Sequence, residues 1–149
     1  MGFFGRLSAS LTGKGKSRLP DQMAILGAPP DLVNEARAKS DEAQEELFIR
    51  FVEGKHACML DWRATRDDVY EGLVPLLSGD ESQLLPPKDN LPEDVAQAIS
   101  AISTALRGSR RALVRTESLG DFSFLILVPL EKEREFIQCV GPWLITENA

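Results

Sequence analysis

The sequence contains few of the side chains that most often carry out catalysis or bind metals. It has one histidine and two cysteines in 149 residues. Cys58 and Cys139 lie far apart in apolar segments and form no metal-ligand or redox spacing, so we expect two reduced thiols in the core. No HExxH or calcium-loop motif occurs, and the TGKGKS segment lacks the spacing and the preceding strand of a phosphate-binding loop. The sequence therefore predicts no metal and no cofactor.

Long hydrophobic runs are also missing. The longest one, Phe122–Leu130, is too short for a transmembrane helix, which needs about 20 apolar residues. The apolar residues near the N-terminus are interrupted by Gly5, Arg6 and Ser8, which is unlike a secretory signal. Arg6 also stands where a myristoylation signal has serine or threonine. These absences predict a cytoplasmic protein.

Negative charge is absent from the first 20 residues. Residues 1–20 hold Arg6, Lys14, Lys16 and Arg18 and no acidic side chain, which leaves 13 basic and all 23 acidic residues in the rest of the chain, a net charge of −10. We expect a flexible basic tail over 1–20 and a single domain over 21–149. The acidic domain would repel nucleic acid and attract a basic protein partner.

The predicted tail has an amphipathic pattern. Phe3, Phe4, Leu7 and Leu11 would share one face of a short helix, with Arg6 opposite. This pattern suits weak contact with an anionic membrane surface, or docking onto a partner or onto the protein's own domain. A disordered tail is the alternative interpretation.

The hydrophobic pattern predicts strands over 56–62, 111–117 and 122–129, the last two as a hairpin. It predicts helices over 32–39, 41–53, 66–77, 92–107 and 131–140. Residues 143–145 are expected to add a short strand or to pack as a tail. Because helices and strands do not alternate regularly, we expect an α+β fold, in which four to five helices cover a small mixed or antiparallel sheet.

Short-range signals predict where these elements begin and end. Asp31 and Thr65 are expected to cap the helices that follow them, and Pro92 suits a first helical position. Pro75 is expected to kink or shorten the helix that contains it. Residues 56–62 are apolar on both faces in the middle, which predicts a strand at the centre of the sheet.

Acidic side chains gather in the first turns of the helix that begins at Asp41. Asp41, Glu42, Glu45 and Glu46 lie there, where the positive end of the helix dipole favours negative charge.

One possible catalytic pair is present. His56 and Cys58 are two residues apart, so in an extended strand both side chains lie on the same face. This placement is compatible with a small hydrolase or transferase that uses a cysteine nucleophile. The other interpretation is a histidine at the start of a strand and a buried cysteine with no joint role.

The end of the first predicted strand is the candidate for partner binding. Trp62 follows Asp61 there, and tryptophan is enriched in interface hot spots. Acidic residues of the next helix, Asp67, Asp68 and Glu71, would extend a negative surface beside it. The alternative is structural, with Trp62 closing the core and the acids stabilising the start of the helix.

A basic cluster interrupts the acidic domain. It consists of Arg107, Arg110, Arg111 and Arg115, with no acidic residue between Leu106 and Thr116. Such a cluster could bind an anion or a phosphate group. The arginines could equally complement the end of a helix and pair with carboxylates elsewhere in the chain.

The segments MLDWRATRDDVYEGLVPLL and ESLGDFSFLILVP resemble an uncharacterised family of small acidic bacterial α+β proteins, similar in outline to immunity proteins. The resemblance implies no catalytic residue. We therefore expect a non-enzymatic binding module of the immunity-inhibitor or adaptor type that presents an acidic face. The alternatives are the enzyme that uses His56 and Cys58, and a membrane-surface accessory protein that uses the tail.

Overall fold

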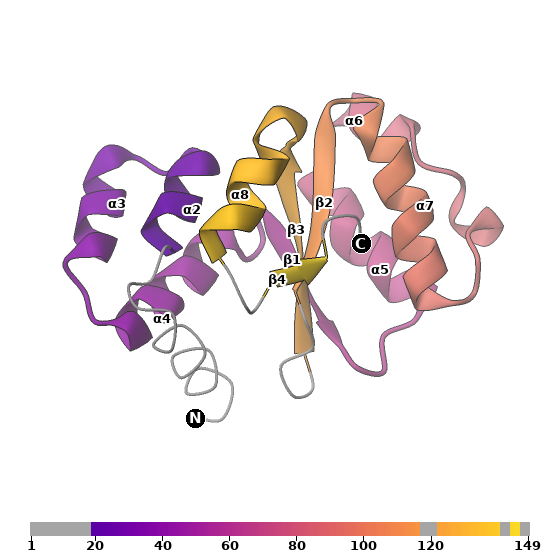
Figure 1. Ribbon diagram of the computed structural model, residues 1–149. Helices are drawn as coiled ribbons and strands as arrows, with labels where there is room; N and C mark the ends of the chain where they lie inside the picture. The colour runs from indigo at the N-terminus through magenta and orange to yellow at the C-terminus, as the bar shows by residue number, and fades with distance from the viewer. Residues whose placement is uncertain (1–18, 117–121, 141–143, 147–149) are drawn as a thin grey trace.

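The computed structural model describes residues 19–116, 122–140 and 144–146, and it confirms the α+β class. A four-stranded antiparallel sheet lies between two groups of helices (Figure 1). The strands follow the order β1-β3-β2-β4 across the sheet. Their bounds are β1 Ala57–Asp61, β2 Arg111–Thr116, β3 Phe122–Pro129 and β4 Leu144–Thr146.

Strand β3 separates two hydrophobic cores. Its residues from Ser123 to Val128 are all buried, and successive side chains of a strand point to opposite faces. Phe124, Ile126 and Val128 therefore enter one core, and Leu125 and Leu127 enter the other. A continuous apolar run is the expected pattern for a strand that is covered on both sides.

Four helices cover the first face of the sheet, and Figure 1 shows them together on one side. Their core contacts include Met23, Val33, Phe48 and Phe136. Helix α2 packs against α3, α4 and α8. The bounds are α2 Leu19–Ile25, α3 Pro30–Arg37, α4 Asp41–Val52 and α8 Glu133–Val140.

The second face is covered by the middle of the chain. Helix α7 packs on β2 through Ile99, Ile102 and Leu106, and α5 packs on both β1 and α7. The helices on this side are α5 Arg66–Leu73, the short α6 Gly79–Gln83 and α7 Val95–Arg107. Single turns of 3-10 helix occur at Val74–Leu76, Lys88–Asn90 and Leu130–Lys132.

The start and the end of α5 confirm two local predictions. The hydroxyl of Thr65 accepts the backbone N–H of Asp68 at 3.3 Å, and the Asp68 carboxylate accepts the N–H of Thr65 at 2.9 Å. This reciprocal pair is a capping box. The α-helix then ends at Leu73, just before Pro75, because proline cannot donate the next hydrogen bond of the helix.

The predicted central position of residues 56–62 is wrong. Among the described strands β1 pairs with β3 and stands first in the sheet order, so it lies at an edge of the sheet; its other contact is an isolated bridge from Ala57 to Glu53. Its two-sided apolar pattern has another cause, because helices cover both faces of this sheet. Ala57 enters one core and Leu60 the other, although the strand has only one neighbour.

Two helix starts differ from the prediction. Helix α3 begins at Pro30, so Asp31 lies in its first turn and forms no side-chain cap. Helix α7 begins at Val95 rather than near Pro92, because the carboxylate of Asp94 caps it by accepting the N–H of Gln97 at 2.9 Å.

The helices also outnumber the prediction. The described residues contain seven α-helices instead of four to five, because α2 and α6 were not expected. The short α6 has its own capping box from Ser78 and Glu81 in a stretch whose composition is typical of turns. Helix α2 begins at Leu19, two residues before the predicted start of the domain, and Leu19 and Pro20 are buried.

The predicted amphipathic face of the tail lies outside the described residues, and it includes Phe3, Phe4, Arg6, Leu7 and Leu11. In the part of the chain that is described, no helix has the length and the apolar character needed to cross a bilayer.

The capping box of α5 gives a stability test. Replacing Thr65 with alanine removes the hydroxyl acceptor and should lower the free energy of unfolding by about 1 kcal/mol. Chemical denaturation measures this change. Thr104→Ala is the matched control, because the exposed Thr104 hydroxyl only bonds the carbonyl of Ser100 within α7. Equal stability of the two variants would contradict a contribution from the cap.

Candidate functional site

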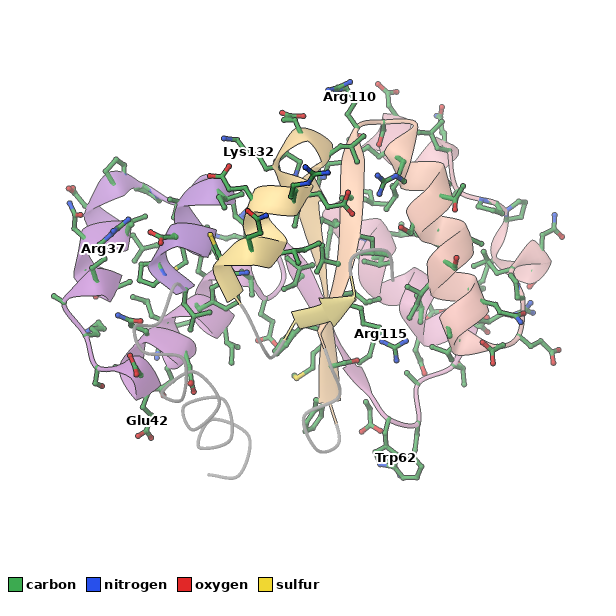
Figure 2. The ribbon with its side chains drawn as sticks, viewed as in Figure 1. Arg37, Glu42, Trp62, Arg110, Arg115 and Lys132 are labelled. Carbon is green, nitrogen blue, oxygen red and sulfur yellow. The ribbon has the colours of Figure 1, made fainter. Side chains whose placement is uncertain are left out.

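Large apolar side chains are exposed at one end of the sheet. Met59 of β1 is 44% exposed, Phe122 of β3 is 38% exposed, and Trp62, which follows β1, is 69% exposed. Phe122 lies opposite Asp61 in the ladder, and Met59 lies opposite Phe124. Trp62 and Phe122 line the same cleft, and we call these two residues the Trp62 patch. Met59 pairs with Phe124 and points to the other face of the sheet from Leu60, so it is not part of this patch. Figure 2 shows Trp62 pointing away from the ribbon.

A small cleft of about 220 Å³ lies beside this patch. The end of β1 and the start of β3 form part of its wall, together with Arg115 of β2 and Val95 of α7. Its lining residues are Leu60, Asp61, Trp62, Ala64, Val95, Arg115, Phe122 and Ser123. The wall of the cleft therefore contains the exposed Trp62, the acidic Asp61 and the basic Arg115.

Asp61 and Arg63 hold the loop that carries Trp62. The carboxylate of Asp61 accepts the backbone N–H of Arg63 at 2.8 Å and lies 3.4 Å from the Arg63 guanidinium. The backbone hydrogen bond, followed by the side-chain bond and the charge of Arg63, lowers the pKa of Asp61. The Arg63 guanidinium also lies 5.6 Å from the centre of the Trp62 ring, within the range of a cation–π contact.

The three predicted acidic residues of α5 each have a local partner. Asp68 belongs to the capping box, and Glu71 forms an ion pair with Lys88 at 3.2 Å. The carboxylate of Asp67 lies 3.5 Å from the Arg66 guanidinium, although its buried Oδ1 has no hydrogen bond. These contacts support the structural interpretation of the α5 acids, while Asp61 and Trp62 lie together at the cleft.

Most of the predicted arginine cluster is paired with carboxylates. Arg107 binds both oxygens of Glu133 at 3.2 Å, Arg110 lies 3.7 Å from Glu131, and Arg111 lies 3.1 Å from Glu81. Each of these carboxylates is far from its arginine in the sequence. A local sequence pattern therefore cannot reveal the ion pairs. Arg115 differs from the other three, because it lines the cleft beside Trp62.

His56 and Cys58 have different surroundings. The His56 ring packs against Phe51 of α4 with 5.0 Å between ring centres. Cys58 packs in the other core, so close to α5 that a methyl group on Gly72 would lie 3.2 Å from its sulfur. Burial lowers the pKa of His56, and burial raises the pKa of Cys58 to about 11. Neither shift favours a thiolate–imidazolium pair at neutral pH.

The raised pKa of Cys58 can be tested by alkylation. In a Cys139→Ser background, iodoacetamide at about pH 7 should modify Cys58 at least about 100-fold more slowly in the folded protein than in denaturant. Burial excludes the reagent, and the thiolate fraction falls tenfold for each unit of pKa. Mass spectrometry measures the rate. Equal rates in both states would show that the thiol is accessible and ionised.

Glu45 is a buried carboxyl in the acidic first half of α4. It lies one turn before the buried Phe48 and two turns before the buried Val52, on the same side of the helix. The side chain is fully buried, and neither carboxylate oxygen has a hydrogen-bond partner. Burial, and then the neighbouring charges of Asp41 and Glu42, raise its pKa from 4.5 to about 8. The sequence pattern predicts Glu45 among the acids stabilised by the helix dipole, and it gives no sign that the side chain is buried.

This pKa predicts how stability depends on pH. Because Glu45 binds its proton more tightly in the folded state, the free energy of unfolding should fall as pH rises from about 4.5 to about 8, by up to about 1.4 kcal/mol per pH unit. Glu45→Gln should remove this slope, whereas Glu46→Gln, an exposed neighbour, should keep it. Urea denaturation across this range measures the slope. A slope that persists in Glu45→Gln would show that another group titrates.

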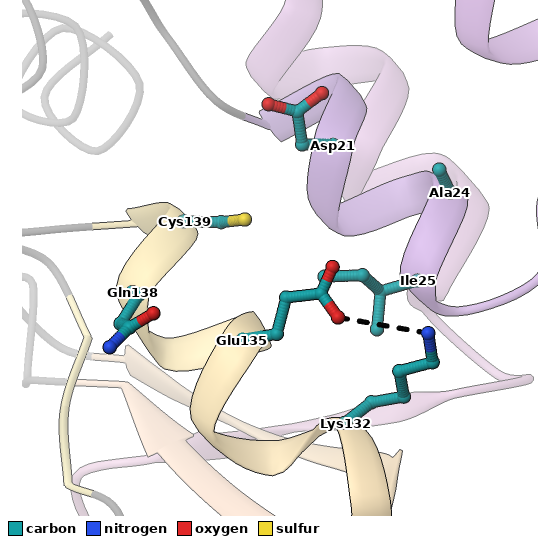
Figure 3. A pocket seen from close by; sticks show the side chains of 7 residues that line it. All are labelled: Asp21, Ala24, Ile25, Lys132, Glu135, Gln138 and Cys139. Carbon is teal, nitrogen blue, oxygen red and sulfur yellow. Dashed lines mark ion pairs between the residues drawn. The ribbon is translucent and has the colours of Figure 1, made fainter.

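A second hollow lies between α2 and α8, with a volume of about 450 Å³ (Figure 3). Its charges are already compensated, because Lys132 pairs with Glu135 at 3.7 Å and Asp21 pairs with Arg37 at 2.9 Å. The lining residues are Asp21, Ala24, Ile25, Lys132, Glu135, Gln138 and Cys139.

Metal binding finds no support within residues 19–116, 122–140 and 144–146, which contain no cluster of three or more candidate ligands. Comparisons of the chain with protein-family models, curated proteins and solved structures give no match. The family resemblance in residues 59–77 and 117–129 therefore stays a prediction.

Proposed function

We propose that the protein is a non-enzymatic protein-binding module that contacts its partner through the Trp62 patch. The observation that carries this proposal is the 69% exposure of Trp62. Tryptophan is among the residues that bury most apolar area in interfaces, and it dominates many binding hot spots. Phe122, which is 38% exposed, lines the same cleft and widens this surface.

The size of the adjoining cleft favours a protein over a small molecule. Pockets that enclose drug-sized ligands usually measure about 300–1,000 Å³. The cleft measures about 220 Å³, and Trp62 on its wall is 69% exposed. A cavity of this size fits one side chain of a partner, while the exposed rings pack against the partner's surface.

The charges around the patch indicate the kind of partner. Asp61 remains ionised at neutral pH, and the carboxylates of Asp67 and Glu71 lie on the helix that follows. Each of these acids already has a basic neighbour in the chain, so a basic partner would compete with those exposed pairs while the apolar centre supplies most of the contact. We therefore propose an immunity-type inhibitor or an adaptor that works in the cytoplasm. The histidine–cysteine alternative receives no support from the contacts of His56 and Cys58.

The proposal can be tested by comparative capture. The full chain, immobilised at low salt, should retain one protein in stoichiometric amount from lysate of the cells that produce it. Trp62→Ala should reduce retention at least about tenfold, since a hot-spot tryptophan contributes about 2 kcal/mol or more. Leu84→Ala is the matched control, because Leu84 is 47% exposed but lies outside the patch. Quantitative mass spectrometry measures retention.

Two results would overturn the proposal. One is the absence of any stoichiometric partner, and the other is equal retention by the Trp62→Ala and Leu84→Ala variants. If the partner is basic, retention should also weaken as the salt concentration rises.

A further inference from the structure

Glu45 of α4 has a buried carboxyl group without a hydrogen-bond partner in the described part of the chain. A buried carboxyl without a hydrogen-bond partner is costly, and buried acids normally have a cation or a donor beside them. Both oxygens of Glu45 lack a partner, while a fully buried glutamine of the same core, Gln22, donates to the carbonyl of Phe136 at 3.1 Å. Among the described residues no group donates a hydrogen bond to Glu45 and no cation pairs with it.

The neighbouring acids of α4 also have no basic partner among the described residues. Glu42 and Glu46 are exposed on α4, and Asp41 is half-buried beside them. Among the described residues no ion pair involves these acids, although acids of α3, α5, α6 and α8 have basic partners. We call Asp41, Glu42, Glu45 and Glu46 the acidic face of α4. Figure 2 shows Glu42 at one end of this helix.

A segment of the same chain has the complementary charge. Residues 1–18 contain Arg6, Lys14, Lys16 and Arg18 and no acid. This segment joins the domain at Leu19, the first residue of α2, and α2 packs directly against α4. Eighteen residues can extend about 60 Å, so the reach is ample. The covalent connection also gives these cations a high effective concentration at α4.

We propose that residues 1–18 bind to the acidic face of α4 in the same molecule, with their basic side chains beside its carboxylates and Glu45 at the inner edge of the contact. This intramolecular contact is independent of the Trp62 patch. A basic external partner that binds α4 would therefore have to compete with the chain's own N-terminal segment.

The observations favour α4 over the groove between α2 and α8. The groove also lies beside the start of α2, but Asp21 and Glu135 already have basic partners there. The acidic face of α4 combines exposed carboxylates that form no ion pair with any described residue and the buried carboxyl of Glu45.

Cross-linking the full chain locates the contact. A zero-length carbodiimide joins lysine amines to carboxylates that touch them, so Lys14 and Lys16 should link to Asp41, Glu42 or Glu46. Mixing ¹⁵N-labelled and unlabelled chains distinguishes links within one molecule from links between two. Links to Asp21 or Glu135, links only between two chains, or no link at low salt would each overturn the proposal.

Proteolysis gives an independent measure of the same contact. Trypsin cleavage after Lys14, Lys16 and Arg18 should be slow at low salt and faster at about 0.5 M salt, where exposed ion pairs are screened. Glu42→Gln/Glu46→Gln should speed cleavage at low salt by about fivefold, as expected for the loss of two surface ion pairs. Glu93→Gln, which neutralises an exposed acid outside α4, should leave the rate unchanged. Equal rates for the wild type and both variants would overturn the proposal.

Discussion

The burial of β3 on both faces is the constraint on which the other elements depend. A strand with six consecutive buried residues needs a layer of helices on each side, and each layer must supply its own apolar stripe. Helices α4 and α8 cover the face of the sheet that carries Phe124 and Ile126. Helices α5 and α7 cover the opposite face, which carries Leu125. Within the described residues no helix contributes to both cores, and the two layers are connected by the sheet and by the ion pair between Arg107 of α7 and Glu133 of α8.

This arrangement also explains where the molecule is exposed. The helices cover the middle of the sheet, but the end formed by Asp61 and Phe122 extends beyond them. Apolar residues that belong to the alternation of the strands are therefore left in solvent at that end. The same end receives the loop that Asp61 and Arg63 hold in place, so a rigid sheet supports the exposed indole of Trp62. A binding surface on such a support loses little freedom when it meets a partner.

Local sequence signals predicted much of the fold, because they act over a few residues. The bounds of β3, the cap at Thr65 and the end of α5 before Pro75 all follow from such signals. The edge position of β1 could not be predicted from its apolar residues. Apolar residues on both faces of a strand show that helices cover both faces of the sheet, but they do not show how many strands pair with it. The pairing of Arg107 with Glu133 requires the packed helices, since 26 residues separate the two side chains. The isolation of Glu45 was likewise invisible, because its place in the first turns of a helix already has a local explanation.

The position of β3 in the chain has a consequence for synthesis. Both cores need this strand, but its residues are translated after those of α2 to α7 and of β1. Until about the last fifth of the chain has been made, the apolar stripes of α4 and α7 have no common surface to pack against. Chains of this kind complete their folding around the end of translation, when long-range strand pairs such as Ala57 with Ile126 can form. A ribosome that stalled before Phe122 would hold a chain with two open cores, a natural substrate for chaperones.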